Sequence, residues 1–217
     1  NQILLNASGS LQIDNRILTY MDNQWKAENE FSWSDLTGKT NVTAVYPVYP
    51  DLDYVQENLY KNNSLEDILY VKDEFPAGNS IHLQFKHLFS LLTLHLEGNL
   101  QTYFQKIEVT CPAVSSIIPK SAEIVLADNG THTTTIAQVS PSGNYSFIVP
   151  PVGNMVIAIN MVTNGKKYTT QLETKSFTGN KEYTYHLKTS EKTPGIITAE
   201  DLIAFSFLIN NKEYNGK

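Results

Sequence analysis

Through the second half of the chain, apolar and polar residues alternate, and turn-forming dipeptides interrupt the alternation. Residues 155–163 carry Met or Ile at every second position, Asn164-Gly165 follows, and a second strand-like run occupies 167–172. Two such runs joined by Asn-Gly are the strongest short-range signal for a β-hairpin, because a type I′ turn requires positive φ at both of its central residues. The alternation therefore predicts antiparallel strands.

Turn signals recur at short intervals after residue 79 and divide this part into eight predicted strands, at residues 80–96, 105–110, 122–127, 133–139, 144–149, 155–163, 166–173 and 181–188. Eight short strands at this spacing indicate an antiparallel β-sandwich. The earlier part is less regular, with strand-like runs at 3–5, 11–13, 16–20, 24–26 and 41–46. A boundary at the Pro-Ala-Gly-Asn sequence of 76–79 would separate an N-terminal β-sandwich domain, 1–78, from a C-terminal one, 79–188.

The alternation changes phase inside one of these predicted strands. Leu83 and Phe85 occupy odd positions, whereas the leucines of 92–96 occupy even positions. A slip of one residue turns every side chain to the opposite face of a sheet, so we expect a bulge or kink across 87–91. His87 lies at this change of phase. We interpret it as a structural histidine that hydrogen-bonds backbone groups, with a lone metal ligand as the alternative.

Residues 189–217 do not continue the strand pattern and instead carry the signals of a helix. The sequence Thr-Ala-Glu-Asp at 198–201 is typical of a helix N-cap with an acidic first turn. Leu202, Phe205 and Ile209 then follow at helical spacing. We expect a linker and a short C-terminal helix that leads into a further module of a longer natural protein. Because the chain does not begin with Met, we also expect that an N-terminal segment was removed.

The charge balance bears on the partners of the protein. Lys and Arg number 16 against 22 Asp and Glu, the net charge is −6, and Arg16 is the single arginine. Such a chain lacks the basic surface that a phosphate backbone requires, so nucleic-acid binding is excluded. No apolar run approaches the ~18–20 residues of a membrane-spanning helix. The one cysteine, Cys111, excludes an intrachain disulfide, and we interpret it as a buried, inert thiol.

Catalytic and cofactor motifs are missing from the sequence, which has no Gly-x-Ser-x-Gly elbow, phosphate-binding loop, His-Glu-x-x-His or Cys-x-x-Cys. His82 and His95 alternate with apolar residues, and we interpret them as solvent-facing strand positions, not zinc ligands. The acidic residues of 51–57 would suit calcium, and the carboxylate pairs at 66–67 and 73–74 would suit glycoside hydrolysis. The spacing of these acidic residues favours positions on the solvated surface over a calcium site or a catalytic pair. We therefore predict no enzyme, no metal and no cofactor.

Five aromatic residues near the N-terminus allow two interpretations: Trp25, Trp33, Tyr46, Tyr49 and Tyr54. An exposed row of these rings would form a contact surface for sugars. In a small sandwich, however, aromatic side chains more often pack in the core and under loops. The first interpretation predicts exposure and the second predicts burial.

Five segments, in order, resemble those of a known family. Residues 85–96 (FKHLFSLLTLHL) resemble the Phe-x-His-x-Leu-Ser-x-Leu-x-Val-x-Leu strand of fimbrillin-like proteins, the Mfa-like branch of the type V pilin superfamily. Residues 42–47 (VTAVYP) are similar to a strand that ends in Ala-Tyr-Tyr-Pro, and 67–70 (DILY) to an Asp-x-Leu segment. Residues 147–150 and 179–185 are similar to late strands, although Asn180 interrupts the usual Gly-Lys-x-Tyr-x-Tyr. The resemblance spans about residues 10–190.

The resemblance implies two tandem transthyretin-like β-sandwiches in a lipoprotein on the outer face of a Gram-negative outer membrane, held by a lipid anchor on the removed segment. It implies fimbrial or other adhesive roles without enzymatic activity, and its partners would be other fimbrial subunits or ligands on host or bacterial surfaces. Polymerising members lose an N-terminal strand after cleavage at Arg or Lys, and a neighbour's strand fills the groove. Arg16 is the candidate for such proteolytic maturation, and an ordinary strand arginine is the alternative.

Three hypotheses of function remain. The tail at 193–205 does not resemble a C-terminal donor strand, which favours a pilus tip or accessory subunit, or a stand-alone adhesin. A polymerising stalk subunit assembled by strand exchange is the second hypothesis. A surface glycan-binding protein that uses the aromatic residues is the third.

Overall fold

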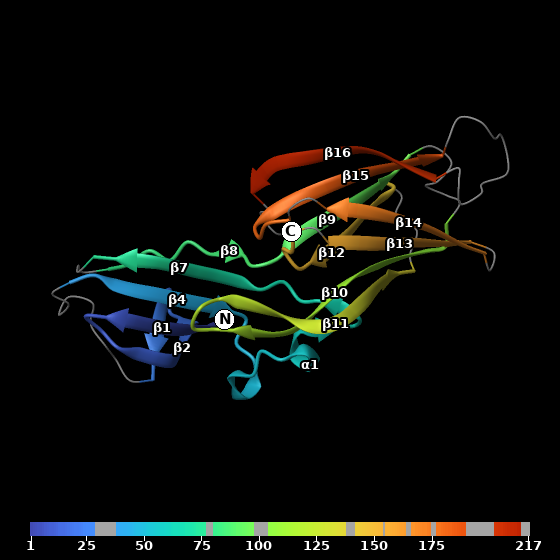
Figure 1. The fold of residues 1–217 in the computed structure, drawn as a ribbon. Helices are drawn as coiled ribbons and strands as arrows, with labels where there is room; N and C mark the ends of the chain where they lie inside the picture. The colour runs from blue at the N-terminus through green and yellow to red at the C-terminus, as the bar shows by residue number, and fades with distance from the viewer. Residues whose placement is uncertain are drawn as a thin grey trace. The chain divides into compact units, whose positions relative to one another are not determined.

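The computed structural model describes residues 1–28, 38–76, 80–97, 104–137, 142–153, 155–163, 166–174, 177–189 and 202–213. Its regular structure is almost entirely β, with one single-turn helix, α1 (Gln56–Leu59), and one 3₁₀ turn, η1 (Pro50–Leu52) (Figure 1). The predicted all-β class is confirmed. The chain forms two compact units. Unit 1 comprises Asn1–Leu59, Asp67–Leu88 and Val114–Val125, and unit 2 comprises Tyr60–Glu66, Phe89–Ala113 and Leu126–Lys217.

Unit 1 is built on a six-stranded sheet in the order β3-β2-β1-β4-β7-β8. Its strands are β1 (Gln2–Gly9), β2 (Ile13–Met21), β3 (Gln24–Ala27), β4 (Thr40–Tyr46), β7 (Leu69–Phe75) and β8 (Lys86–His87). All neighbouring pairs are antiparallel. The runs predicted at 11–13 and 16–20 are one strand, β2, because Asn15 takes a left-handed conformation (φ 50°) that absorbs the break in the pattern.

One buried cluster of unit 1 lies against one face of this sheet, and Leu4 and Val45 are buried on the other face. Alternate residues of β1, namely Ile3, Leu5 and Ala7, join buried residues of β2, β4 and β7 in a single cluster. Ile81, Leu83 and Phe85 pack against this cluster, although residues 80–85 are not a strand. The alternation in this segment is therefore real, since every second side chain covers the sheet.

Unit 2 contains two four-stranded sheets, ordered β11-β10-β13-β14 and β12-β9-β15-β16, and a small hairpin of β5 (Tyr60–Lys61) and β6 (Ser64–Leu65). The longer strands are β9 (Ser90–Leu96), β10 (Lys106–Ile118), β11 (Glu123–Ile136), β12 (Asn144–Val149), β13 (Met155–Thr163), β14 (Lys166–Thr174), β15 (Lys181–Thr189) and β16 (Leu202–Glu213). The hairpin predicted around Asn164-Gly165 is present as the antiparallel pair β13–β14.

Among the described residues, the core of unit 2 is a cluster of nineteen buried side chains, which come from both sheets except for Phe104 and Phe177. Every second residue contributes, as in Leu92, Leu94 and Leu96 of β9 and Ile157 and Ile159 of β13. A two-sheet sandwich buries one face of each strand in this manner, which explains the period-2 pattern in the sequence. The finer prediction of two tandem transthyretin-like sandwiches stays a prediction.

The change of phase at 87–91 marks the passage of the chain between the two units. β8 ends at His87 in the sheet of unit 1, and β9 begins at Ser90 in a sheet of unit 2. The expected kink is therefore present. Residues 80–88 belong to unit 1, so this passage differs from the boundary predicted at 76–79.

Two strands are longer than the sequence pattern suggests. β10 continues through Cys111 and Pro112, beyond the end of the strand predicted at 105–110, and β11 joins the strands predicted at 122–127 and 133–139. Asn129 within β11 has φ 52°, so the Asn-Gly signal there bends a continuous strand and does not reverse it. Each of these strands has residues in both units.

The expected C-terminal helix is wrong, because residues 202–213 form strand β16, antiparallel to β15. An apolar run of this length fits a buried helix or a strand equally well by periodicity, and its Phe and Ile residues favour a strand. The all-antiparallel expectation also needs one correction: β15 pairs with β9 in parallel. β15 reaches β9 after five intervening strands, so no hairpin fixes their relative direction.

Candidate functional site

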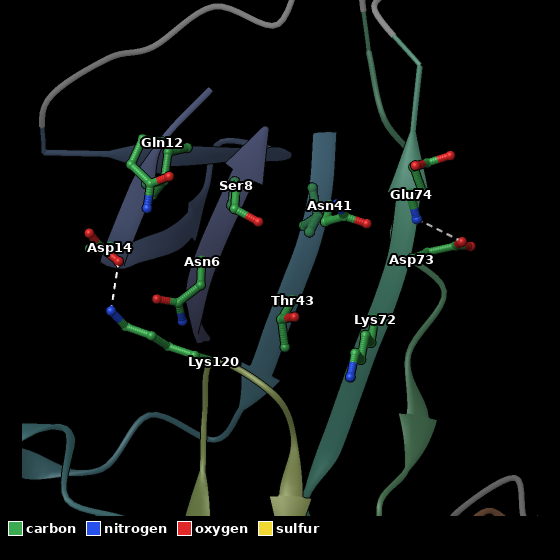
Figure 2. A pocket seen from close by; sticks show the side chains of 13 residues that line it. Asn6, Ser8, Gln12, Asp14, Asn41, Thr43, Lys72, Asp73, Glu74 and Lys120 are labelled. Carbon is green, nitrogen blue, oxygen red and sulfur yellow. Dashed lines mark hydrogen bonds and ion pairs between the residues drawn. The ribbon is translucent and has the colours of Figure 1, made fainter. Parts of the chain in front are cut away.

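A polar hollow of about 500 Å³ opens on the sheet of unit 1 (Figure 2). Its walls come from β1, β2, β4 and β7, from the turn between β1 and β2 and from the turn between β10 and β11: Asn6, Ala7, Ser8, Gln12, Ile13, Asp14, Asn41, Val42, Thr43, Lys72, Asp73, Glu74 and Lys120. Most of these side chains are amides, hydroxyls or charged groups. The hollow therefore offers many hydrogen-bonding groups in one concave place.

Strand alternation explains why this face is polar. On β1 the odd-numbered residues enter the core cluster, and Leu4, Asn6 and Ser8 point to the opposite face. Along that face the side chains change from the buried, apolar Leu4 to the exposed, polar Ser8. Neighbouring β4 shows the same change from Val45 to Asn41. The hollow is the polar end of a face whose other end is apolar.

Asn6 lies at a bulge beneath the hollow. The pairing of β1 with β2 shifts between Leu5 and Ala7, so Asn6 has no regular partner in β2. Its Oδ1 atom accepts a hydrogen bond of 2.9 Å from the backbone N–H of Asn15. Its Nδ2 atom is buried without a hydrogen-bond partner among the described residues, and the side chain as a whole is 6% exposed. An unpaired buried donor costs about 1–3 kcal/mol, so this amide would gain from a polar ligand that accepts its hydrogen bond.

Two ion pairs border the hollow. Lys120 Nζ lies 2.7 Å from Asp14 Oδ1, and Lys39 Nζ lies 2.6 Å from Glu74 Oε1. The dashed line in Figure 2 marks the pair of Lys120 and Asp14. The hydrogen bond and the charge of Lys120 hold the pKa of Asp14 below its usual value, and the same two effects of Glu74 raise the pKa of Lys39. Two of the three carboxylates of the hollow are thus paired with lysines. This arrangement suits binding of a neutral polar ligand better than acid–base catalysis.

The five aromatic residues do not form one surface. Tyr49 and Tyr54 are buried and pack edge to face with ring centroids 5.0 Å apart, and burial raises the pKa of Tyr54. Tyr46 is half-buried and packs against the core of unit 1, and Trp33 lies outside the described residues. Trp25 is exposed and lies 5.2 Å, centroid to centroid, from the ring of Tyr20, which the sequence analysis had not singled out.

The other candidate residues lie in ordinary strand positions. Arg16 is within β2, opposite Leu5 of β1. The Nδ1 atom of His87 lies 2.7 Å from the Asp67 carboxylate. The backbone hydrogen bonds expected of this side chain stay a prediction. Cys111 is buried in the core of unit 2, and this burial raises the pKa of its thiol to about 12.

Sequence reasoning missed the hollow and a cluster of His95, Glu97 and His186 in unit 2. The alternation marked several of these residues as facing solvent. Which outward-facing residues meet depends on the pairing of distant strands, and His95 and His186 are 91 positions apart in the sequence. Across the described part of the chain, no helix has the length and apolar character needed to cross a bilayer.

Comparison with known proteins supplies the family. The family model for fimbrillin-like proteins matches residues 6–203 of the chain. Comparison with curated proteins finds no match.

Three solved structures illustrate the shared fold. A candidate cell adhesion protein from Bacteroides ovatus superposes with a TM-score of 0.62 at 13% identity, covering 96% of this chain and 87% of its own. Another from Bacteroides uniformis has a TM-score of 0.60 at 11% identity and coverage of 88% and 86%. The tip fimbrial protein Mfa3 of Porphyromonas gingivalis has a TM-score of 0.52 at 10% identity and coverage of 96% and 93%. By the match over most of its length, this chain belongs to the fimbrillin-like family.

Proposed function

We propose that this protein is a cell-surface adhesion protein, either a tip or accessory subunit of a pilus or a stand-alone adhesin. The family match over residues 6–203 carries the proposal. The fold shared with two candidate adhesion proteins and with a tip fimbrial protein supports it. In this role the protein displays a binding surface and catalyses no reaction. Its partners are other fimbrial subunits or ligands on host or bacterial surfaces.

We favour a tip or adhesin role over that of a stalk subunit because two strands, β1 and β16, are already paired within the chain. β1 pairs with β2 on one side and β4 on the other, and Arg16 is part of this ladder. Removal of residues 1–16 would take away a central strand of the sheet. At the other end of the chain, β16 pairs with β15 of its own chain at a sheet edge. Neither strand is free to exchange with a neighbour without first breaking these pairs.

Cleavage at Arg16 tests this preference directly. The purified chain would be incubated with an arginine-specific protease and followed by mass spectrometry and size-exclusion chromatography. We expect the chain to stay intact and monomeric, and the Arg16→Gln variant to behave identically. Cleavage after Arg16 followed by polymers that the Arg16→Gln variant does not form would instead favour the stalk subunit.

The proposed location is the outer face of the outer membrane, through a lipid on a segment that precedes this chain. Expression of the complete reading frame in a Gram-negative host, with labelling by a radioactive fatty acid, tests the anchor. Labelled protein that external protease removes from intact cells is the expected result. Unlabelled protein in the periplasm would contradict the proposed location.

Glycan binding is a second candidate function, and two observations favour it. Tyr20 and Trp25 are each 43% exposed and form an aromatic pair, and the hollow carries amides and hydroxyls. A glycan array tests it, with Trp25→Ala and Asn6→Ala as separate variants. Binding that only Trp25→Ala removes would assign the aromatic pair, and binding that only Asn6→Ala removes would assign the hollow. If the array shows no binding, the glycan hypothesis fails and the ligand of the proposed adhesin is expected to be a protein.

A further inference from the structure

The outer face of one sheet of unit 2 brings together residues that are distant in the sequence. β9, β12, β15 and β16 form this sheet (Figure 1). The leucines of β9 at 92–96 and Tyr183, Tyr185 and Leu187 of β15 enter the core. By alternation, His95 on β9 and His186 on β15 point to the opposite, outer face.

The parallel register sets the two histidines side by side. His95 is the direct partner of His186, and their ring centroids are 5.0 Å apart. Glu97 lies two residues beyond His95, on the same face, and its backbone N–H donates a hydrogen bond of 2.9 Å to the carbonyl of Leu187. This bond extends the ladder and fixes the backbone of Glu97 beside His186. Three potential ligands thus project from two adjacent, hydrogen-bonded strands.

The ligand atoms of these three side chains converge. One ligand atom from each of His95, Glu97 and His186 lies within 4.8 Å of the other two. His186 Nδ1 and Glu97 Oε1 are only 2.8 Å apart. With bonds of ~2.0–2.2 Å to a tetrahedral ion, ligand atoms are separated by about 3.3 Å. To surround one ion, His186 and Glu97 would separate by about 0.5 Å, and the widest pair would close by at most about 1.5 Å.

A supporting residue orients His95. Its Nδ1 atom lies 2.5 Å from Oδ1 of Asn144, its direct partner on β12. An amide oxygen only accepts, so Nδ1 carries the proton and Nε2 keeps its lone pair for a metal ion. Metal-binding histidines usually have such a partner on the second ring nitrogen. The pairing of β15 with β16 is also irregular between Tyr185 and Leu187, which places His186 at a bulge.

The donor set selects the class of cation. Two imidazole nitrogens and one carboxylate suit zinc and the neighbouring first-row divalent ions, whereas calcium and magnesium prefer oxygen ligands alone. All three residues are half-buried, and the side chains of His186 and Glu97 are 25% and 42% exposed. An ion can therefore enter from solvent, and three protein ligands leave a coordination position open for water.

We propose that His95, Glu97 and His186 form a binding site for a divalent transition-metal ion on the outer face of unit 2. The site goes beyond the proposed adhesive function and does not depend on it. It also revises the interpretation of His95 as a merely solvent-facing residue. The competing explanation is a hydrogen bond between His186 and Glu97 that serves the sheet alone.

Titration of the untagged chain with ZnCl₂ by isothermal calorimetry tests the proposal. We expect one zinc ion per chain and at least tenfold weaker binding in each of His95→Ala, His186→Ala and the nearly isosteric Glu97→Gln. Replacing the supporting residue, Asn144→Ala, is expected to weaken binding about tenfold. Cobalt(II) provides a second measurement, because its visible absorption reports nitrogen and oxygen ligands in a tetrahedral site.

His82→Ala is the matched control, since His82 is exposed and lies in unit 1. Its zinc affinity should equal that of the parent chain, and circular dichroism should show every variant folded. If a variant fails to fold, the cobalt(II) spectrum of the parent chain shows whether nitrogen and oxygen ligands hold the ion in a tetrahedral site. Absence of zinc binding, unchanged affinity in all three ligand variants, or equal affinity for calcium would overturn the proposal.

Discussion

The sheet of unit 1 that carries the hollow and the β12-β9-β15-β16 sheet of unit 2 each have a buried apolar face and polar residues on the other face, although one end of that other face in unit 1 is also buried and apolar. In unit 1 the polar face has amides, hydroxyls and lysine–carboxylate pairs around a hollow. In unit 2 it has two imidazoles and a carboxylate that converge. The same alternation thus produces a hydrogen-bonding surface in one unit and a set of metal ligands in the other. Strand register decides which residues meet.

The two buried faces differ as well. Unit 2 encloses nineteen clustered residues between two sheets, whereas the cluster of unit 1 has eight, covered in part by the non-strand segment 80–85. A core closed by two sheets tolerates little loss of volume, because neighbouring strands are fixed by their ladders and cannot collapse into a cavity.

Phe147→Ala should have the largest effect. Phe147 is 2% exposed in the core of unit 2, and its loss leaves a cavity between the sheets. We expect a decrease of about 3–5 kcal/mol in the free energy of unfolding, measured by chemical denaturation. A decrease below about 1 kcal/mol would show that this core can repack.

Gly9→Ala should destabilise unit 1. Gly9 has φ +124°, and a Cβ atom there would lie 2.7 Å from the backbone oxygen of Lys39. The β1–β4 pairing would have to shift, at a cost of about 1–3 kcal/mol. Thermal unfolding measures it, with the exposed Ser8→Ala as the control. Equal stability of the two variants would contradict the close approach.

Asn6→Ala should cost about 1 kcal/mol in free energy of unfolding, because the N–H of Asn15 loses its acceptor while one unpaired donor disappears. Denaturation in urea measures the difference. A stabilised variant would mean that the unpaired Nδ2 outweighs the hydrogen bond, and would strengthen the case for a ligand at the hollow.

Cys111 reports whether the core of unit 2 excludes solvent. Its pKa is raised to about 12, so the folded protein should not react with Ellman's reagent at pH 8, whereas the unfolded chain should react at once. Because the folded pKa lies above the unfolded one, the thiol's contribution to stability is full below pH 9 and declines as the pH rises toward 12. Rapid reaction of the native protein would contradict the burial.

Lys120→Met should have the smallest effect, because the Asp14–Lys120 pair is exposed to solvent. The pKa of Asp14, measured by NMR, should rise toward its usual value of 3.8. Since the folded pKa is lowered, the contribution of the pair is present above pH 3.8 and is lost as the pH falls through the folded pKa. An unchanged pKa would mean that the pair does not form in solution.

Some of the fold could be predicted because it depends on neighbouring residues. The β13–β14 hairpin followed from Asn164-Gly165 and two alternating runs, and the kink after His87 followed from the change of phase. The tail could not be predicted, because an apolar run satisfies its backbone in a helix alone but in a strand only beside a partner. That partner, β15, is more than ten residues away.

Alternation and short motifs are local properties, so the β class, the family and the residues that face away from the core could be predicted from the sequence alone. The pairing of distant strands, in contrast, places Asn6 beneath a hollow and His95 beside His186. The first result depends on the antiparallel register of β1, β2, β4 and β7, and the second on a parallel pairing between segments about ninety residues apart. Hydrogen bonds between distant strands set that register, and no local pattern encodes it.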